Sequence, residues 1–427
     1  MALLLSATTE IEEFDRVLAH GGLRAVYQPI VRLSDRRTVA VESLARGPVG
    51  SPLESPLALF RLARRLGRTQ DLDRACRAAA LAGARPAAAA GLTLFVNVEP
   101  GALDGGDAEA EADRIAEGAH GTPVVVELAE RALGRDPARL LALVRRLRRR
   151  GLAVALDDVG AAPESLALLP LIRPEVVKLD LWVVQRRSGA RVAEVVAAVG
   201  AYAEESGALV VAEGIEHQAH LRAAQAMGAS YGQGWWLGRP APLATLDLGP
   251  GASLDIQGGA VLGEDPDASP YALCSQGRAP VLVDKALLVA VSRRLERQAL
   301  AQGRHSVVLA SFEEARFLTP DTRRRYRRLA DRTAFVAVLG EGIGGMPESG
   351  VRGAHLAAGD PVRREWDLVV LGPHLSAALV ARDLGDVGAD GERRFASVVT
   401  YDRPLVCAAG RALISRVVAP SRLGARH

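Results

Sequence analysis

Residues 121–160 read GTPVVVELAERALGRDPARLLALVRRLRRRGLAVALDDVG, and they contain one unit of the pattern that decides the fold. Val124 to Leu128 is a short aliphatic and β-branched run that is followed by a longer helical stretch rich in Ala, Leu and Arg. Leu152 to Leu156 is the next short run. A strand, a helix and a second strand in this order predict neighbouring parallel strands with a helix packed against them.

The same rhythm recurs from Arg24 to Leu237. The aliphatic runs are Ala25 to Ile30, Val39 to Leu44, Leu92 to Val98, Val124 to Leu128, Leu152 to Leu156, Val176 to Leu179, Leu209 to Ala212 and Tyr231 to Leu237. Eight short strands that alternate with helices predict an α/β fold in which the sheet closes into a TIM-like (β/α)8 barrel.

A second, smaller α/β domain is expected after the barrel, because 427 residues are too many for one core of ordinary size. Gly249 to Pro270 is rich in Gly, Asp, Ser and Pro and indicates a connection. We expect the barrel at residues 14–245, a linker at 246–269 and the second domain at 270–420. The expected strands of that domain are 306–310, 335–339, 368–371 and 396–400, and its expected helices are 284–302, 320–332, 376–382 and 405–417.

Composition limits the classes of partner. The formal charge of +3 is a small difference between 53 basic and 50 acidic residues, so we expect neither nucleic acid nor membrane among the partners. The three cysteines lie far apart and form no CxxC pair, which favours a reducing compartment. The apolar opening is too short for a signal peptide, and a cytoplasmic protein is expected.

Polar side chains follow the predicted barrel strands. They are Gln28, Glu42, Asn97, Glu127, Asp157, Asp158, Lys178, Asp180, Glu213, Glu216 and Gln233. The ends of the strands share one rim of such a barrel, and the active site is built there. Carboxylate and amide oxygens with no accompanying His or Cys suit Mg²⁺ or Mn²⁺. Two such ions could clamp a phosphodiester and activate water, and Lys178 could orient that water.

Eight ordered motifs resemble the EAL-domain cyclic di-GMP phosphodiesterases. They are QPI at 28–30, ESLAR at 42–46, NVEP at 97–100, ELAER at 127–131, DDVG at 157–160, KLD at 178–180, AEGIE at 212–216 and QGWWLGRPAP from Gln233. Their number and order make the resemblance specific. It implies opening of cyclic di-GMP to linear pGpG, and a homodimer.

The resemblance also implies a role for each matched residue. Two Mg²⁺ or Mn²⁺ ions would be held by Glu42, Asn97, Glu127, Asp157, Asp158 and Glu213. Lys178 would lie beside the attacking water, and Lys178, Glu42 and Asp157 would be the catalytic group. Gln28 and Arg46 would contact the substrate, while Glu216 and Gln233 would help to hold the metal site and its loop; we group these four as substrate-binding residues.

Two departures from the family pattern leave more than one function open. Ser43 replaces the alanine of the name-giving tripeptide, and the carboxylate of Glu42 is retained. After Asp157 the chain reads DDVGAAPE where active members usually read DDFGTG. Loss of the threonine and the second glycine could misplace Asp158. The alternatives to a hydrolase are therefore an inactive cyclic di-GMP receptor and an interaction scaffold.

The second domain resembles the DICT module, a sensory domain. The segments that carry this resemblance begin at Val283, Ser311, Glu365 and Arg393, within about residues 270 to 420. The resemblance implies signal input through an unknown ligand or protein and no defined chemistry.

Overall fold

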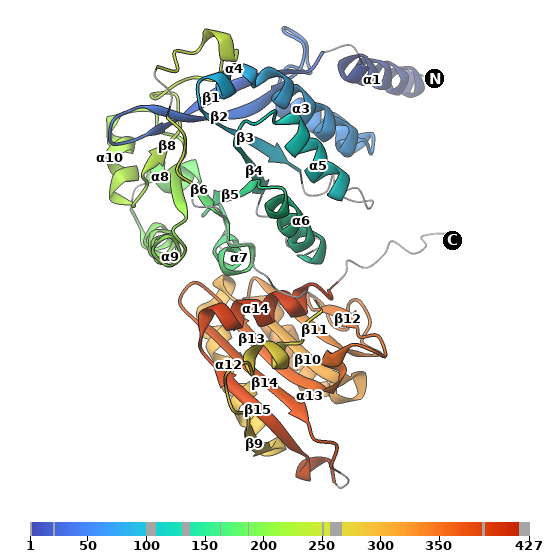
Figure 1. The fold of residues 1–427 in the computed structure, drawn as a ribbon. Coiled ribbons are helices and arrows are strands. Elements are labelled where there is room, and N and C mark those ends of the chain that lie inside the picture. The colour runs from blue at the N-terminus through green and yellow to red at the C-terminus, as the bar shows by residue number, and fades with distance from the viewer. Residues whose placement is uncertain are drawn as a thin grey trace. The chain divides into compact units, whose positions relative to one another are not determined.

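The computed structural model describes residues 2–19, 22–99, 108–129, 137–162, 164–186, 188–249, 252–256, 267–386 and 389–417. The chain divides into two compact units (Figure 1). The first contains Met1–Ala132, Leu143–Ala161 and Pro174–Ala260, and the second contains Leu133–Ala142, Ala162–Arg173 and Val261–His427. The predicted fold class is confirmed, because a closed eight-stranded barrel is followed by a separate sheet-rich domain. The exact domain limits remain predictions.

The barrel closes in the order β1 to β8. Its strands are β1 (Arg24–Arg32), β2 (Thr38–Arg46), β3 (Thr93–Val98), β4 (Val124–Ala129), β5 (Ala153–Val159), β6 (Val176–Leu179), β7 (Leu209–Ala212) and β8 (Tyr231–Gly232). The helices of this part of the chain are α1 (Ala2–Ala19), α2 (Pro56–Arg65), α3 (Thr69–Gly83), α4 (Arg85–Ala89), α5 (Ala108–Gly118), α6 (Pro137–Arg149), α7 (Ser165–Ile172), α8 (Leu181–Arg186), α9 (Ala190–Ser206) and α10 (Gln218–Ala226).

Strand β1 differs from the expected parallel barrel, since it pairs antiparallel with both β2 and β8. Gln28 therefore lies within a strand and not at the carboxyl end of one. It still faces the predicted site, because the register places Gln28 opposite Glu42. Strand β8 is also shorter than expected, since the predicted run continued to Leu237.

The barrel interior is filled by aliphatic side chains, as the low aromatic content requires. Ile30, Phe95, Val125 and Val211 belong to one buried cluster inside the sheet. Leu254, from the segment expected to be a linker, packs against this cluster and is 7% exposed. Side chains from different strands thus form a solid core that leaves the rim for polar residues.

The second sheet has the order β12-β11-β10-β13-β14-β15-β9. Its strands are β9 (Val281–Asp284), β10 (Val307–Glu314), β11 (Phe335–Glu341), β12 (Arg352–His355), β13 (Glu365–Leu371), β14 (Ser376–Asp383) and β15 (Arg394–Thr400). Its helices are α11 (Pro270–Cys274), α12 (Lys285–Gln302), α13 (Pro320–Arg332) and α14 (Arg403–Ile414). Residues of α12 and α13 share a buried cluster with alternate residues of the sheet, among them Ala310 and Leu368. Gly410 of α14 lies against Leu371, whose side chain is on the face of the sheet opposite to α12 and α13. Helix α14 therefore packs on that opposite face.

The expected helix at 376–382 is wrong, because this segment is strand β14. Its alanines favour a helix locally, but β14 pairs antiparallel with both β13 and β15, and its central side chains are buried. Tertiary pairing overrides a weak local preference. Helix α13 was placed correctly, and the side chain of Thr319 caps it by accepting from the backbone N–H of Thr322 at 3.3 Å.

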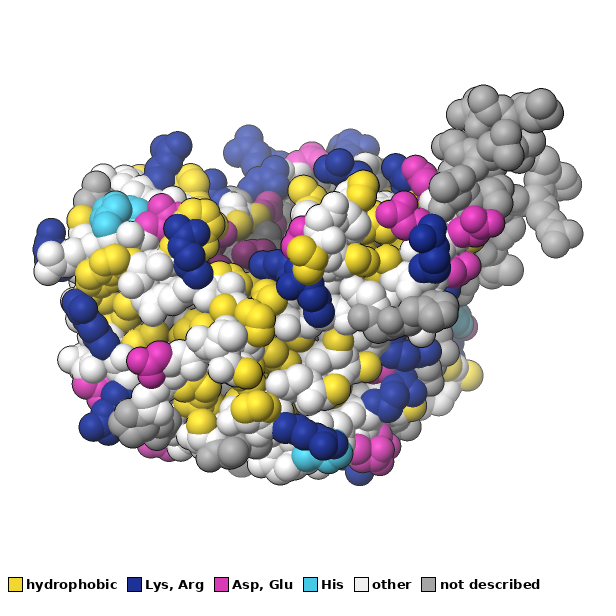
Figure 2. Space-filling model, turned by 90° about the horizontal axis from the view of Figure 1, so that it is seen from above, with side chains coloured by type: hydrophobic (Ala, Val, Ile, Leu, Met, Phe, Trp, Pro, Cys, Tyr) yellow, Lys and Arg dark blue, Asp and Glu magenta, His cyan; other side chains and the backbone are white. Residues whose placement is uncertain are grey.

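Figure 2 shows one face of the molecule, on which basic side chains stand singly or in small groups among acidic and hydrophobic ones. This mixed distribution agrees with a net charge of only +3. In the part of the chain that the structure describes, no helix is both long enough and apolar enough to cross a membrane.

Candidate active site

Lys178 of β6 is the centre of a buried cluster of four carboxylates. Its Nζ atom lies 3.2 Å from Glu42, 2.6 Å from Glu127, 3.1 Å from Asp157 and 2.8 Å from Glu213. These acidic residues belong to β2, β4 and β5 and to the position just after β7. Residues far apart in the sequence therefore meet at the barrel rim, as the strand-end pattern predicted.

Three amide side chains extend the cluster around Glu42. Asn97 Nδ2 donates to Glu42 Oε1 at 3.1 Å, and Gln233 Nε2 donates to Glu42 Oε2 at 2.7 Å. Gln233 Nε2 also lies 3.0 Å from Gln28 Oε1, and Gln28 Nε2 donates to the carbonyl oxygen of Gly238 at 3.0 Å. These bonds fix the Glu42 carboxylate in one position between β1, β2 and the chain after β8.

A bulge in β5 turns two successive carboxylates toward the same place. The pairing of β5 with β6 shifts between Leu156 and Val159, and Asp158 has a left-handed φ of 57°. As a result, carboxylate oxygens of Asp157, Asp158 and Glu213 lie within 4.8 Å of one another. A bulge that re-aims a side chain is common beside active sites. Of the unusual residues in the following loop, Pro163 lies outside the described residues.

Two predicted residues are not brought into this cluster. Arg46 is half-buried and donates to the neighbouring carbonyl oxygen of Ala45 at 2.8 Å. Glu216 is exposed, and among the described residues its side chain makes no ion pair or hydrogen bond with the cluster. Of the other nine predicted site residues, eight lie in the Lys178 cluster or are hydrogen-bonded to it, and the ninth, Asp158, lies beside Asp157 and Glu213.

Burial and crowding shift the ionisation of the cluster. Burial and the nearby charge of Glu42 raise the pKa of Glu127 well above its usual value. Burial also raises the pKa of Glu213, to about 8. Burial acts in the same direction on Glu42, but Lys178 and the hydrogen bonds from Gln233 and Asn97 outweigh it and hold the pKa of Glu42 below its usual value.

The residues present fit a divalent cation. Glu127 is 1% exposed, and its Oε2 atom has no hydrogen-bond partner among the described residues. An unpaired carboxylate oxygen inside a protein is costly unless something positive compensates for it. Lys178 supplies one positive charge for four contacting carboxylates, and the oxygen-rich donor set suits Mg²⁺ or Mn²⁺.

A cavity of about 390 Å³ opens beside the cluster. Its walls include Glu42, Asn97, Asp157 and Asp158 on the polar side, and Leu57 and Phe60 on the apolar side. A volume of this size is within the range of small-molecule sites, which is roughly 300–1,000 Å³.

Asp73 and Arg77 of α3 also line this cavity, and they belong to a buried ion-pair network that was not predicted from the sequence. Arg77 is 4% exposed and bonds Asp73 and Glu111, and Asp73 Oδ1 accepts from the backbone N–H of Glu99 at 3.1 Å. Asp73 thereby ties α3 to the chain just after Asn97. The available signal was a charged pair at positions i and i+4 of an otherwise Ala-rich helix.

Some relatives of this chain are named cyclic di-GMP phosphodiesterases. The cyclic di-GMP phosphodiesterase NbdA of Pseudomonas aeruginosa is 30% identical over 257 residues, which are 57% of this chain and 33% of that protein. The cyclic di-GMP phosphodiesterase RocR of the same organism is 34% identical over 120 residues, which are 28% of this chain and 31% of that protein. The chain spans about a third of the length of these relatives.

The fold has counterparts among solved structures and family models. The EAL domain of Xanthomonas citri FimX, solved in complex with c-diGMP, matches with a TM-score of 0.51 and 20% identity over 58% of this chain and 99% of that one. Residues 271–384 match the DICT model, described as a sensory domain in diguanylate cyclases and two-component systems. Residues 11–240, more than half of the chain, match the EAL domain model, and the chain therefore belongs to the EAL domain family.

Proposed function

We propose that this protein is a metal-dependent phosphodiesterase that hydrolyses cyclic di-GMP to linear pGpG. The observation that carries the proposal is the convergence of four carboxylates on Lys178 at the edge of a cavity of about 390 Å³. The relatives NbdA and RocR, both named cyclic di-GMP phosphodiesterases, support the choice of substrate.

We assign the metal ligands to six residues, which are Glu42, Asn97, Glu127, Asp157, Asp158 and Glu213. Asp157, Asp158 and Glu213 already have oxygens within 4.8 Å of one another, and Glu127 has an unpaired oxygen. Two Mg²⁺ or Mn²⁺ ions held there would neutralise phosphate charge and lower the pKa of a water molecule.

Lys178 then has a chemical role of its own. The reaction adds one water across one phosphodiester: the water oxygen bonds to phosphorus, the bond to the ribose 3′ oxygen breaks, and that oxygen leaves with a proton. The Lys178 ammonium, which four carboxylates keep charged, can donate a hydrogen bond to the attacking water or to a phosphate oxygen. We therefore count Lys178, Glu42 and Asp157 as the catalytic group.

The roles proposed for the four substrate-binding residues are supported to different degrees. Gln28 and Gln233 hold Glu42 in place, which supports a positioning role for both. Arg46 lies near the rim on β2, and its guanidinium could reach a bound phosphate. For the exposed Glu216, no contact among the described residues adds support to the role that the family resemblance implies.

A receptor without turnover is the second candidate, because residues 161–164 depart from the pattern of active relatives. The position of Asp158 favours the hydrolase, since its carboxylate still lies with those of Asp157 and Glu213 despite the altered loop. Three further properties are proposals that rest on the family resemblances: a homodimer, regulation of the barrel by the second domain, and a signal ligand or protein at that domain. A cytoplasmic location is a proposal that rests on the cysteine usage and the short apolar opening.

The test is incubation of the full chain with cyclic di-GMP and Mn²⁺ or Mg²⁺, with pGpG followed by chromatography and binding by calorimetry. Product that disappears with EDTA and in Glu42→Gln, but persists in Glu204→Gln, supports the hydrolase. Glu204 is an exposed residue of α9 and serves as the matched control. Binding without product would leave the receptor, and no binding at all would refute both.

A further inference from the structure

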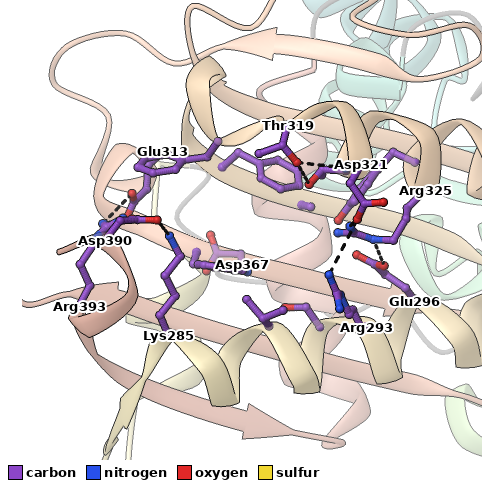
Figure 3. Close-up of a pocket in the computed structure, with 18 residues that line it drawn as sticks. Lys285, Arg293, Glu296, Glu313, Thr319, Asp321, Arg325, Asp367, Asp390 and Arg393 are labelled. Atoms are coloured by element: carbon purple, nitrogen blue, oxygen red, sulfur yellow. Dashed lines mark hydrogen bonds and ion pairs between the residues drawn. The ribbon is translucent and has the colours of Figure 1, made fainter.

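A second cavity lies in the sheet-rich domain, between α12, α13 and one face of the sheet. Its volume is about 320 Å³ (Figure 3). The apolar part of its wall includes Val289, Phe312, Phe317, Tyr326 and Trp366. The rings of Phe312 and Tyr326 pack edge to face at a centroid distance of 5.3 Å. Aromatic walls of this kind accept flat, apolar molecules.

The charged side chains of the wall lie in two groups at opposite ends of the cavity (Figure 3). At one end Lys285 pairs with Asp390, and Arg393 lies 2.8 Å from Glu313. The other end contains Arg293, Glu296, Asp321 and Arg325.

Each cation at that second end also has an acidic partner. Arg325 lies 2.9 Å from Glu296 and 2.6 Å from Asp321, and Arg293 lies 3.8 Å from Asp321. A charged ligand would have to break one of these pairs, so the cavity favours a neutral one.

A buried hydroxyl in the wall lacks a partner. Ser292 of α12 is 6% exposed, and its Oγ atom has no hydrogen bond among the described residues. A buried polar group without a partner destabilises the fold, so such groups usually have a water or a ligand beside them.

Tyr326 also belongs to the wall. Burial raises the pKa of Tyr326 well above its usual value, so its hydroxyl stays protonated.

Asp367 also borders the cavity, but its carboxylate is turned away from it. Leu368 belongs to the cluster on the α12 and α13 face, and side chains alternate along a strand, so Asp367 points to the opposite face. There it accepts a hydrogen bond from Ser311 Oγ at 2.9 Å. The polar group left for a ligand to satisfy is thus the neutral hydroxyl of Ser292.

We propose that this cavity is the ligand site of the second domain and that it binds a neutral, flat aromatic molecule with one hydrogen-bonding group directed at Ser292. The aromatic walls would enclose the ring system, and the paired charges at both ends would exclude ions. This proposal gives the signal-input role proposed above a location and a ligand class, and it rests on that role only for its biological meaning.

The probe for the test is 2-naphthol, with 2-naphthoate as an anionic molecule of similar size, each titrated into the full chain at pH 7 and followed by ligand-observed NMR. We expect saturable binding of 2-naphthol and at least about tenfold weaker binding of 2-naphthoate. Ser292→Ala should weaken the binding of 2-naphthol by about 3- to 10-fold through the lost hydrogen bond.

Ser292→Leu should abolish binding by filling the cavity, whereas Arg297→Leu, on the exposed side of the same helix, should leave it unchanged. Far-ultraviolet circular dichroism of both leucine variants checks that they fold alike. Absence of saturable 2-naphthol binding, equal binding of 2-naphthoate, or unchanged binding in Ser292→Leu would each overturn the proposal. Cyclic di-GMP is left out of the titration, so a barrel without hydrolytic activity would not affect the result.

Discussion

Lys178 Nζ lies 2.6 Å from Glu127 Oε1, and both residues are only 1% exposed. The Lys178 ammonium has no access to bulk water, so it and the ionised carboxylates around it compensate one another. Removing the positive partner from such a cluster usually costs about 3–5 kcal/mol, because the carboxylate charge that remains stays buried.

Lys178→Met should therefore destabilise the metal-free protein by about 3–5 kcal/mol and lower turnover by at least about 100-fold. We expect Mn²⁺ to recover more stability in the variant than in the unaltered protein, because the ion then supplies the only positive charge in the cluster. Thermal unfolding in EDTA and in Mn²⁺ measures this difference. Equal unfolding temperatures of the two proteins in EDTA would contradict the compensating role of Lys178.

Glu127→Gln separates metal binding from folding. Burial raises the pKa of Glu127 well above its usual value, so the folded, metal-free protein already holds a neutral side chain at pH 7. The substitution should change the unfolding temperature in EDTA by no more than about 2 °C and should cost about 100-fold or more in Mn²⁺ affinity. Calorimetric titration with Mn²⁺ measures the affinity, and Glu204→Gln is again the control. An unchanged affinity would remove Glu127 from the ligand set.

The site was predictable from the sequence because its residues occupy strand ends, and a barrel brings strand ends together whatever their separation in the chain. Glu42, Glu127 and Lys178 are far apart in sequence and still meet. The reversed direction of β1 was not predictable, since a single strand has the same alternation in either direction. Strand β14 was mistaken for a helix because its alanine content carries no information about its neighbours in the sheet.

Metal binding should release protons and strengthen as the pH rises. Burial raises the pKa of Glu213 to about 8, so this carboxyl is mostly protonated at pH 7 in the metal-free protein. A cation binds the ionised forms of Glu213 and Glu127, so the apparent affinity for Mn²⁺ should rise from pH 6 to pH 8. Calorimetry in two buffers of different ionisation enthalpy counts the protons released at pH 7. A count of zero would contradict the raised pKa.

Gly160→Ala should disturb the bulge that carries Asp158. Gly160 has a φ of 99°, and a Cβ atom there would lie 2.6 Å from Val183 Cγ2. The strained backbone and the overlap should together cost about 2–4 kcal/mol. Val183→Ala removes the overlapping atom, so the double variant should be more stable than the sum of the single changes predicts. Strict additivity in urea unfolding would show that the contact with Val183 is not the cause.

Asp367→Asn should stabilise the protein at neutral pH. Burial and the nearby Glu365 raise the pKa of Asp367 well above its usual value, so the folded state keeps the proton. Above the unfolded-state pKa of roughly 3.9 the unfolded chain releases that proton, and the free energy of unfolding falls as the pH rises. Asparagine removes this cost. The unfolding temperature of the variant should therefore exceed that of the unaltered protein at pH 7.5, and the difference should shrink toward pH 4.

Asp331→Asn, at an exposed position of α13, should show no such trend. If the difference between Asp367→Asn and the unaltered protein stayed constant from pH 4 to 7.5, the carboxyl would titrate normally and the cost of burial would have another source.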